Sequence, residues 1–125
     1  MKPIKPVHLN DTGAAVSNLH KGLLFLIMYE PGISDNDRRT LQTQLAPDLQ
    51  TETFGQATFR LVKLWQEQLN NRSDVPNELK PLVQNGDVDQ KTANALNWLL
   101  RQLGALTDEF RINDSNGTAM MGPIL

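Results

Sequence analysis

Two histidines are the first residues in this chain that could bind a metal ion or move a proton. His8 and His20 are the only histidines among the 125 residues, and neither has a Glu or Cys beside it at metal-ligand spacing. A zinc site needs three or four convergent ligands. The sequence therefore predicts no metal site, and it predicts that His20 is a polar residue on a helix.

Paired carboxylates are a second candidate, because two neighbouring acids can act as general acid and base or bind calcium. Asp35 with Asp37 and Asp87 with Asp89 form such pairs. Both pairs occur where a helix is expected to begin, and acidic groups there satisfy free amides and the helix dipole. The stretch 85–89 also lacks the ligand series and terminal glutamate of a calcium hand. Capping is the predicted role.

Nucleophilic and phosphate-transfer chemistry have no candidate residues in this sequence. Cysteine is absent, so the chain has no thiolate nucleophile, no disulfide and no thiolate metal site. It also contains no paired nucleophile and base and no glycine-rich phosphate loop. The sequence therefore predicts a protein that is not an enzyme and that needs no cofactor.

Charge and hydropathy exclude two classes of partner. A formal net charge of -2 and a sequence pI of about 5.6 give no general attraction to phosphate backbones. Arg38-Arg39 and the pair Arg60 and Lys63 have acidic neighbours, which favours a solvated face over a DNA-reading helix. The apolar run 23–29 is far shorter than the roughly 20 residues of a membrane span. We expect no nucleic acid and no membrane span.

Helix signals define three long helices. Asn10-Asp11-Thr12 supplies capping residues for a helix over 13–28, which the turn 30–32 ends with proline and glycine. Two further helices are predicted over 56–71 and 90–103, the last of them capped by Asp89. Each of these helices has apolar residues at helical spacing, so each needs a partner to cover one face.

The connections between the long helices contain shorter elements. A polar helix over 37–45 is expected in the first connection, closed by Ala46-Pro47, and 77–83 can form a short turn of helix. The predicted fold is all-α, a compact three-helix bundle with an extra short helix in the first connection. A single domain is expected over 1–112, followed by a tail or linker over 113–125.

One spacing of four, three and four residues recurs in the three long helices and predicts the core. Positions so spaced lie on one helical stripe, and the large side chains on it are expected to be buried core residues. The first copy is the weaker one, because Gly13 follows its threonine. The three copies are Thr12, Val16, Leu19, Leu23; Thr58, Val62, Trp65, Leu69; and Thr92, Leu96, Leu99, Leu103.

These residues resemble the pattern of the peptidoglycan-binding-like domains. The resemblance rests on Gly13-x-x-Val16-x-x-Leu19 in the first helix, Phe54-Gly55-x-x-Thr58 with Trp65-Gln66 in the second, and Asn85-Gly86-x-Val88-x-x-x-Thr92 before the last. It covers residues 9 to about 103. The chain departs from the pattern at His20, where glutamine is common, at Glu52 and Asp89, where glycine is common, and in two longer connections, 30–53 and 71–84. Such expanded versions resemble those embedded in large multidomain bacterial proteins, including some toxin-complex components.

The resemblance implies a non-catalytic binding module whose ligand is cell-wall peptidoglycan, through its glycan or stem peptide. The ligand is expected in a shallow groove between helix ends, near 54–58 and 85–89. Gln66 is also read as a structural hydrogen bonder. Trp98 lies off the apolar stripe of its helix and is read as a residue that covers a loop, stacks on a sugar or supports an interface. The candidate ligand-binding residues are Phe54, Thr58, Gln66, Asn85, Asp87 and Trp98.

A different class of function stays open beside wall binding. The longer connections and the 113–125 segment are also typical of a protein-interaction or spacer domain in a larger assembly, with other protein domains as partners. Met1–Pro6 is not followed by a long apolar run, so no signal peptide is predicted. Wall binding would therefore place the chain in the bacterial envelope or outside the cell by another route of export.

Overall fold

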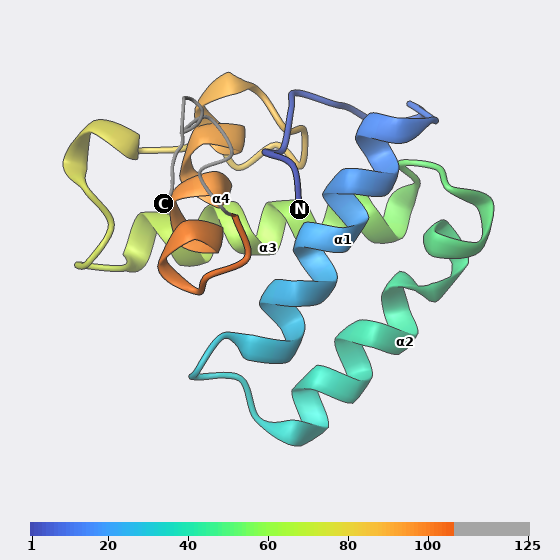
Figure 1. The fold of residues 1–125 in the computed structure, drawn as a ribbon, viewed down its shortest axis with the longest axis horizontal. Helices are drawn as coiled ribbons and strands as arrows, with labels where there is room; N and C mark the ends of the chain where they lie inside the picture. The colour runs from blue at the N-terminus through green and yellow to red at the C-terminus, as the bar shows by residue number, and fades with distance from the viewer. Residues whose placement is uncertain (107–125) are drawn as a thin grey trace, which may run out of the picture.

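A computed structural model describes residues 1–106 of the chain, and these residues form a helical fold (Figure 1). The helices are α1 (Ala14–Tyr29), α2 (Asp35–Thr51), α3 (Gln56–Asn71) and α4 (Gln90–Gln102), with a 3₁₀ turn, η1 (Asn77–Leu79), before the last. Within 1–106 the only β pairing consists of two isolated bridges, Val7 with Val88 and Thr12 with Thr53. The all-α class is confirmed. The predicted tail over 113–125 and the domain end at 112 lie outside the described residues.

The four helices are arranged around α1 and α3. Figure 1 shows α1 beside α2, with α3 running across behind α1, and α4 on the opposite side of the molecule from α2. α2 contacts α1 and α3, while α4 contacts α1 and η1. The expected bundle is therefore present, and the extra helix forms its own side of it.

The N-terminal lead-in closes the bundle over α4. Asn97 holds it through two bonds, because the Ile4 amide donates to Asn97 Oδ1 at 2.7 Å and Asn97 Nδ2 donates to the Ile4 carbonyl at 3.0 Å. Val7 and Val88 then exchange a pair of backbone bonds at 3.0 and 2.9 Å. The segment that makes these contacts with α4 is extended, and Pro3 and Pro6 favour this form because proline disrupts a helix.

The three predicted stripes form the core. Thr12 is the exception, since it is exposed and bridges Thr53 instead of starting a buried stripe. Leu103, at the end of the last stripe, is only partly buried. The fully or almost fully buried members are Val16, Leu19, Leu23, Val62, Trp65, Leu69, Leu96 and Leu99, together with Thr58 and Thr92.

The helix in the first connection is longer than the sequence predicts. It was expected over 37–45 with Ala46-Pro47 as its end, and that end is wrong, because α2 continues through Pro47 to Thr51. A proline inside a helix costs about 3 kcal/mol or more. In α2 the residues on both sides of Pro47 are held by the rest of the protein, because Leu45 is buried in the core and Asp48 is buried and bonded to Gly55 and Thr58. α2 is therefore a long helix that packs against both α1 and α3.

Candidate functional site

Asp48 connects α2 to the start of α3. Its Oδ2 accepts bonds from the Thr58 amide at 2.7 Å, the Thr58 hydroxyl at 2.6 Å and the Gly55 amide at 3.0 Å. Two of these donors are the free amides of a helix start that has no side-chain cap of its own. A carboxylate there also balances the helix dipole. Asp48 therefore caps α3 from another helix and uses the hydroxyl of Thr58 for the purpose.

His20 extends this cluster into α1. Its Nε2 lies 2.9 Å from the Thr58 hydroxyl oxygen, and the side chain is 4% exposed. Since that hydroxyl donates its proton to Asp48, it must accept from His20, which places the imidazole proton on Nε2. A catalytic histidine takes the proton from the hydroxyl it activates. The proton runs the opposite way here, so the cluster binds α1, α2 and α3 together.

Burial lowers the pKa of His20 below its ordinary value of 6.5, and the nearby charge of Asp48 opposes this only in part. The folded chain therefore binds fewer protons at this site than the unfolded chain does. The stability that comes from keeping His20 neutral is fully present above pH 6.5, the ordinary pKa of histidine in the unfolded chain. It is lost as the pH falls towards the lower pKa of His20 in the folded chain.

We expect the free energy of unfolding to decrease between about pH 7.5 and about pH 5, and to decrease less in a His20→Gln variant. Glutamine can donate to the Thr58 hydroxyl and has no titrating group. Urea denaturation at several pH values measures the difference. His8→Gln is the matched control, because His8 is 70% exposed in its side chain. A His20→Gln chain with the pH dependence of the unaltered chain would contradict this role.

Gln66 holds the segment before α4. Its Oε1 accepts from the buried Gly86 amide at 2.9 Å, and its Nε2 donates to the Asp87 carbonyl at 2.8 Å and to the Thr92 hydroxyl at 3.0 Å. Asp89 completes this helix start by accepting from the Thr92 amide at 2.7 Å. Both donors of the Gln66 amide and one of the two lone pairs on its oxygen are therefore occupied by the protein itself.

The six predicted ligand-binding residues do not gather on one open surface. Phe54, Thr58 and Gln66 are completely buried, and the polar atoms of the last two already have partners. Trp98 is half-buried and packs against the core. Asp87 is half-buried and Asn85 is exposed, so only Asn85 is freely accessible among the six. None of them lines either of the two hollows described next.

Two adjoining hollows lie between α2 and α3. Their volumes are about 350 and about 510 Å³, and they share Leu41, Gln44 and Leu64. We call the pair the α2–α3 groove. Its narrower end is lined by Thr43, Leu45, Pro47, Ala57, Arg60 and Leu61 besides the shared residues. Its wider end adds Glu30, Gly32, Ile33, Asp37, Thr40, Trp65, Gln68 and Arg72.

The wider end of the groove holds two buried polar atoms without partners. Glu30 Oε1 accepts from Arg72 Nη1 at 2.6 Å, but Glu30 Oε2 has no partner, and neither has the indole Nε1 of Trp65. Arg72 also donates to Asp74, from Nη2 at 2.7 Å and from Nε at 2.9 Å. This ion pair raises the pKa of Arg72 and lowers that of Asp74. Buried polar groups normally have partners, so Glu30 Oε2 and Trp65 Nε1 are exceptions among the described residues.

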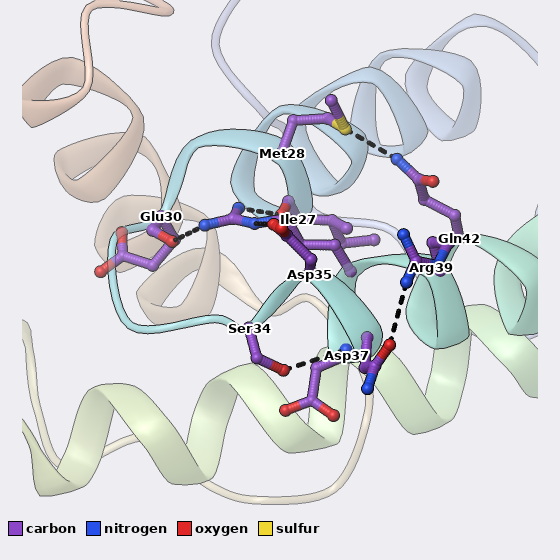
Figure 2. Close-up of polar contacts among 10 residues, drawn as sticks. Ile27, Met28, Glu30, Ser34, Asp35, Asp37, Arg39 and Gln42 are labelled. Atoms are coloured by element: carbon purple, nitrogen blue, oxygen red, sulfur yellow. Dashed lines mark hydrogen bonds and ion pairs between the residues drawn. The ribbon is translucent and has the colours of Figure 1, made fainter.

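The turn between α1 and α2 shapes this end (Figure 2). Arg38 donates to the carbonyls of Ile27 and Glu30 at 2.6 and 3.0 Å, which ties α2 to the last turn of α1. Ser34 accepts from the Asp37 amide at 3.2 Å. Figure 2 shows the Asp37 carboxylate pointing away from this turn, on the side of α3. Asp37 itself is exposed.

The sequence predicts a polar, peripheral helix in the first connection and therefore does not indicate this groove. One signal was present, since Leu41 and Leu45 are one turn apart and both face α3. The partner stripe on α3, at positions 57, 61, 64 and 68, was overlooked because the core stripe on the same helix is stronger. The capping role predicted for Asp89 is what the structure shows.

Comparison with known proteins identifies no relative: no family model matches the chain, and no curated protein or solved structure matches it either. Within residues 1–106, no three His, Cys, Asp or Glu side chains come together in a way that could hold a metal ion. No helix in the same range is long and apolar enough to cross a membrane.

Proposed function

We propose that this chain is a non-catalytic binding module for bacterial cell-wall peptidoglycan, of the peptidoglycan-binding-like type, and that the ligand lies in the α2–α3 groove. The motif resemblance supports the ligand. The groove supports the location of the site and is the observation that carries the proposal, because it is open, runs along two helices, and combines apolar walls with exposed polar side chains such as Gln44 and Gln68.

The lining of the groove fits a ligand of mixed polarity. Leu41, Leu61 and Leu64 provide apolar contact, while Gln44 and Gln68 provide amide donors and acceptors. A sugar–peptide polymer presents both kinds of group along its length. Binding sites of this kind are largely apolar, with a few polar groups that fix orientation. The expected site near 54–58 and 85–89 is replaced in this proposal, since its side chains are mostly engaged within the protein.

Sedimentation with purified insoluble peptidoglycan tests the proposal. At low salt, we expect a substantial part of the protein to pellet with the wall material and to remain in the supernatant without it. Soluble wall fragments added in excess should release the pelleted protein. A chain that stays wholly in the supernatant would overturn the proposal.

A second candidate is a protein-interaction domain within a larger assembly. The observation that favours it is the apolar surface: Leu64 is 38% exposed at the junction of the two hollows, and Met28 and Tyr29 are 45% and 60% exposed at the end of α1. Exposed apolar side chains, such as the adjacent pair Met28 and Tyr29, are typical of protein contacts where they form a patch. A pull-down that recovers wall fragments and no protein would contradict this candidate.

A further inference from the structure

α1 has a second apolar face, on the side opposite its buried stripe. Phe25 and Tyr29 lie one turn apart there, and the centroids of their rings are 4.6 Å apart. Tyr29 is 60% exposed and Met28 is 45% exposed. We call this side, formed by Lys21, Leu24, Phe25, Met28 and Tyr29, the outer face of α1. A surface helix normally has one apolar stripe, so a second one indicates a further partner.

The described part of the chain ends beside α1. The Met1 ammonium donates to the Ala105 carbonyl at 3.0 Å, which ties the end of the described chain to its beginning. The Met1 side chain in turn contacts α1, because its Cε lies 3.3 Å from the position that a Cβ on Gly22 would take. Leu106, the last described residue, is 7% exposed and belongs to the core. The chain therefore leaves the described region next to the middle of α1.

The sequence that follows has the pattern of a segment with one apolar face. In 107–112, Thr-Asp-Glu-Phe-Arg-Ile, the apolar Phe110 and Ile112 alternate with the charged Glu109 and Arg111. Successive side chains of an extended chain point to opposite sides. In an extended form this segment therefore presents both apolar side chains on one side, where a helix face could cover them.

The spacing of this pattern matches the spacing on α1. Alternate residues of an extended chain are about 6.6 Å apart, and the helical turn from Phe25 to Tyr29 rises about 6 Å. The two apolar side chains of the segment can therefore lie on Phe25 and Tyr29 at the same time. The four residues from Leu106 to Phe110 reach at most about 14 Å. This length covers the rise of about 4.5 Å along α1 from its middle to Phe25.

Charge complementarity sets the direction of the segment. Lys21, one turn before Phe25, is exposed and is the only Lys, Arg, Asp or Glu in α1. No acid among residues 1–106 lies within salt-bridge distance of it. Asp108 lies two residues before Phe110, on the same side of an extended segment. Exposed ion pairs stabilise little, so this pair selects the orientation and the apolar contacts provide the affinity.

From the uncovered face, the exit point, the spacing and the charge, we infer that residues 107–112 pack along the outer face of α1, in the same direction as the helix. The three expected pairs are Asp108 with Lys21, Phe110 with Phe25, and Ile112 with Tyr29. The contact agrees with the domain end at 112 that the sequence predicts. The outer face of α1 contributes no residue to the α2–α3 groove, so this inference stands or falls independently of the wall ligand.

Nitration of the full chain with tetranitromethane tests the contact, because Tyr29 is the only tyrosine. We expect Phe110→Ser to raise the rate of Tyr29 nitration about fivefold, which corresponds to about 1 kcal/mol, since the segment then leaves the ring exposed. Arg111→Ser is the matched control. It introduces the same residue at the next position, on the opposite side of the segment, and should leave the rate unchanged.

A second measurement needs no substitution. In the unaltered chain we expect nuclear Overhauser contacts between the ring protons of Tyr29 and the methyl groups of Ile112. Equal nitration rates in the unaltered chain and both variants, or the absence of these contacts, would overturn the inference. Protection of Tyr29 that increases with protein concentration would also overturn it, because a second copy of the chain would then cover this face.

Discussion

Replacing Trp65 with alanine is expected to lower the free energy of unfolding by roughly 3–5 kcal/mol, because a buried Trp loses both its transfer free energy and the contacts around the cavity it leaves. Trp65 is 5% exposed and lies on the buried stripe of α3 between Val62 and Leu69, which are completely buried. Stability of that size is a large fraction of what a small domain has. Part of the altered chain should therefore be unfolded at room temperature.

Urea denaturation followed by far-ultraviolet circular dichroism measures this loss. Trp98→Ala is the matched control, because Trp98 is only half-buried and packs at the edge of the core. It should cost clearly less than Trp65→Ala. Equal losses in the two variants, or a loss below about 1 kcal/mol for Trp65→Ala, would contradict the assignment of Trp65 to the core.

Gln66→Leu is expected to lower the free energy of unfolding by roughly 2–5 kcal/mol, although leucine is similar in size and more apolar. The substitution removes the partners of the Gly86 amide and the Asp87 carbonyl, and it takes a bond from the Thr92 hydroxyl. Each buried polar group left unpaired costs about 1–3 kcal/mol. The segment before α4 should loosen as a result.

Gln68→Leu, two residues further along α3, is the control for that prediction. Gln68 is exposed, so its replacement should change stability by no more than about 0.5 kcal/mol. Hydrogen exchange of the Gly86 amide adds a local measurement, since its protection should fall in Gln66→Leu and not in Gln68→Leu. If Gln66→Leu were as stable as the unaltered chain, the structural role of this amide would be wrong.

The long helices could be predicted because their local signals agree with their packing. α3 runs over the predicted residues 56–71, since its apolar stripe and the turns on both sides of it indicate the same bounds. α4 is predicted to within one residue for the same reasons, with Asp89 as the cap that sequence favours. In both helices the residues that make the stripe are also the ones that fill the core.

α2 could not be predicted in full because its C-terminal half depends on distant contacts. Pro47 is a strong local signal for a helix end. No local pattern indicates that Asp48 accepts a bond from the Thr58 amide, ten residues later, at the start of α3. Of the α2 residues that line the groove, only Pro47 lies beyond residue 45, so the groove is formed mainly by the part of the helix that the sequence predicts. None of the residues that carry the motif resemblance lies in α2, so the sequence points to residues 54–58 and 85–89 and does not indicate this groove.

The buried polar clusters were visible in the sequence only as residue types. Thr58 and Gln66 were selected as ligand contacts because of their place in the motif, but their partners, Asp48 and Gly86, are set by how the helices meet. His20 was predicted to be a polar helix residue, and the structure buries it beside Thr58. The sequence contains these polar side chains, but which of them form hydrogen bonds with each other depends on how the helices pack.

Sedimentation of the Leu64→Lys and Val83→Lys variants with insoluble peptidoglycan tests the central claim, that the α2–α3 groove holds the wall ligand. Leu64 is 38% exposed and lines both hollows, whereas Val83 is 62% exposed and lines neither, so the same substitution adds one charge inside or outside the groove. We predict that Leu64→Lys raises the apparent Kd about tenfold, or about 1.4 kcal/mol, and that Val83→Lys binds as the unaltered chain does. Equal pelleting of both variants and the unaltered chain would contradict the claim.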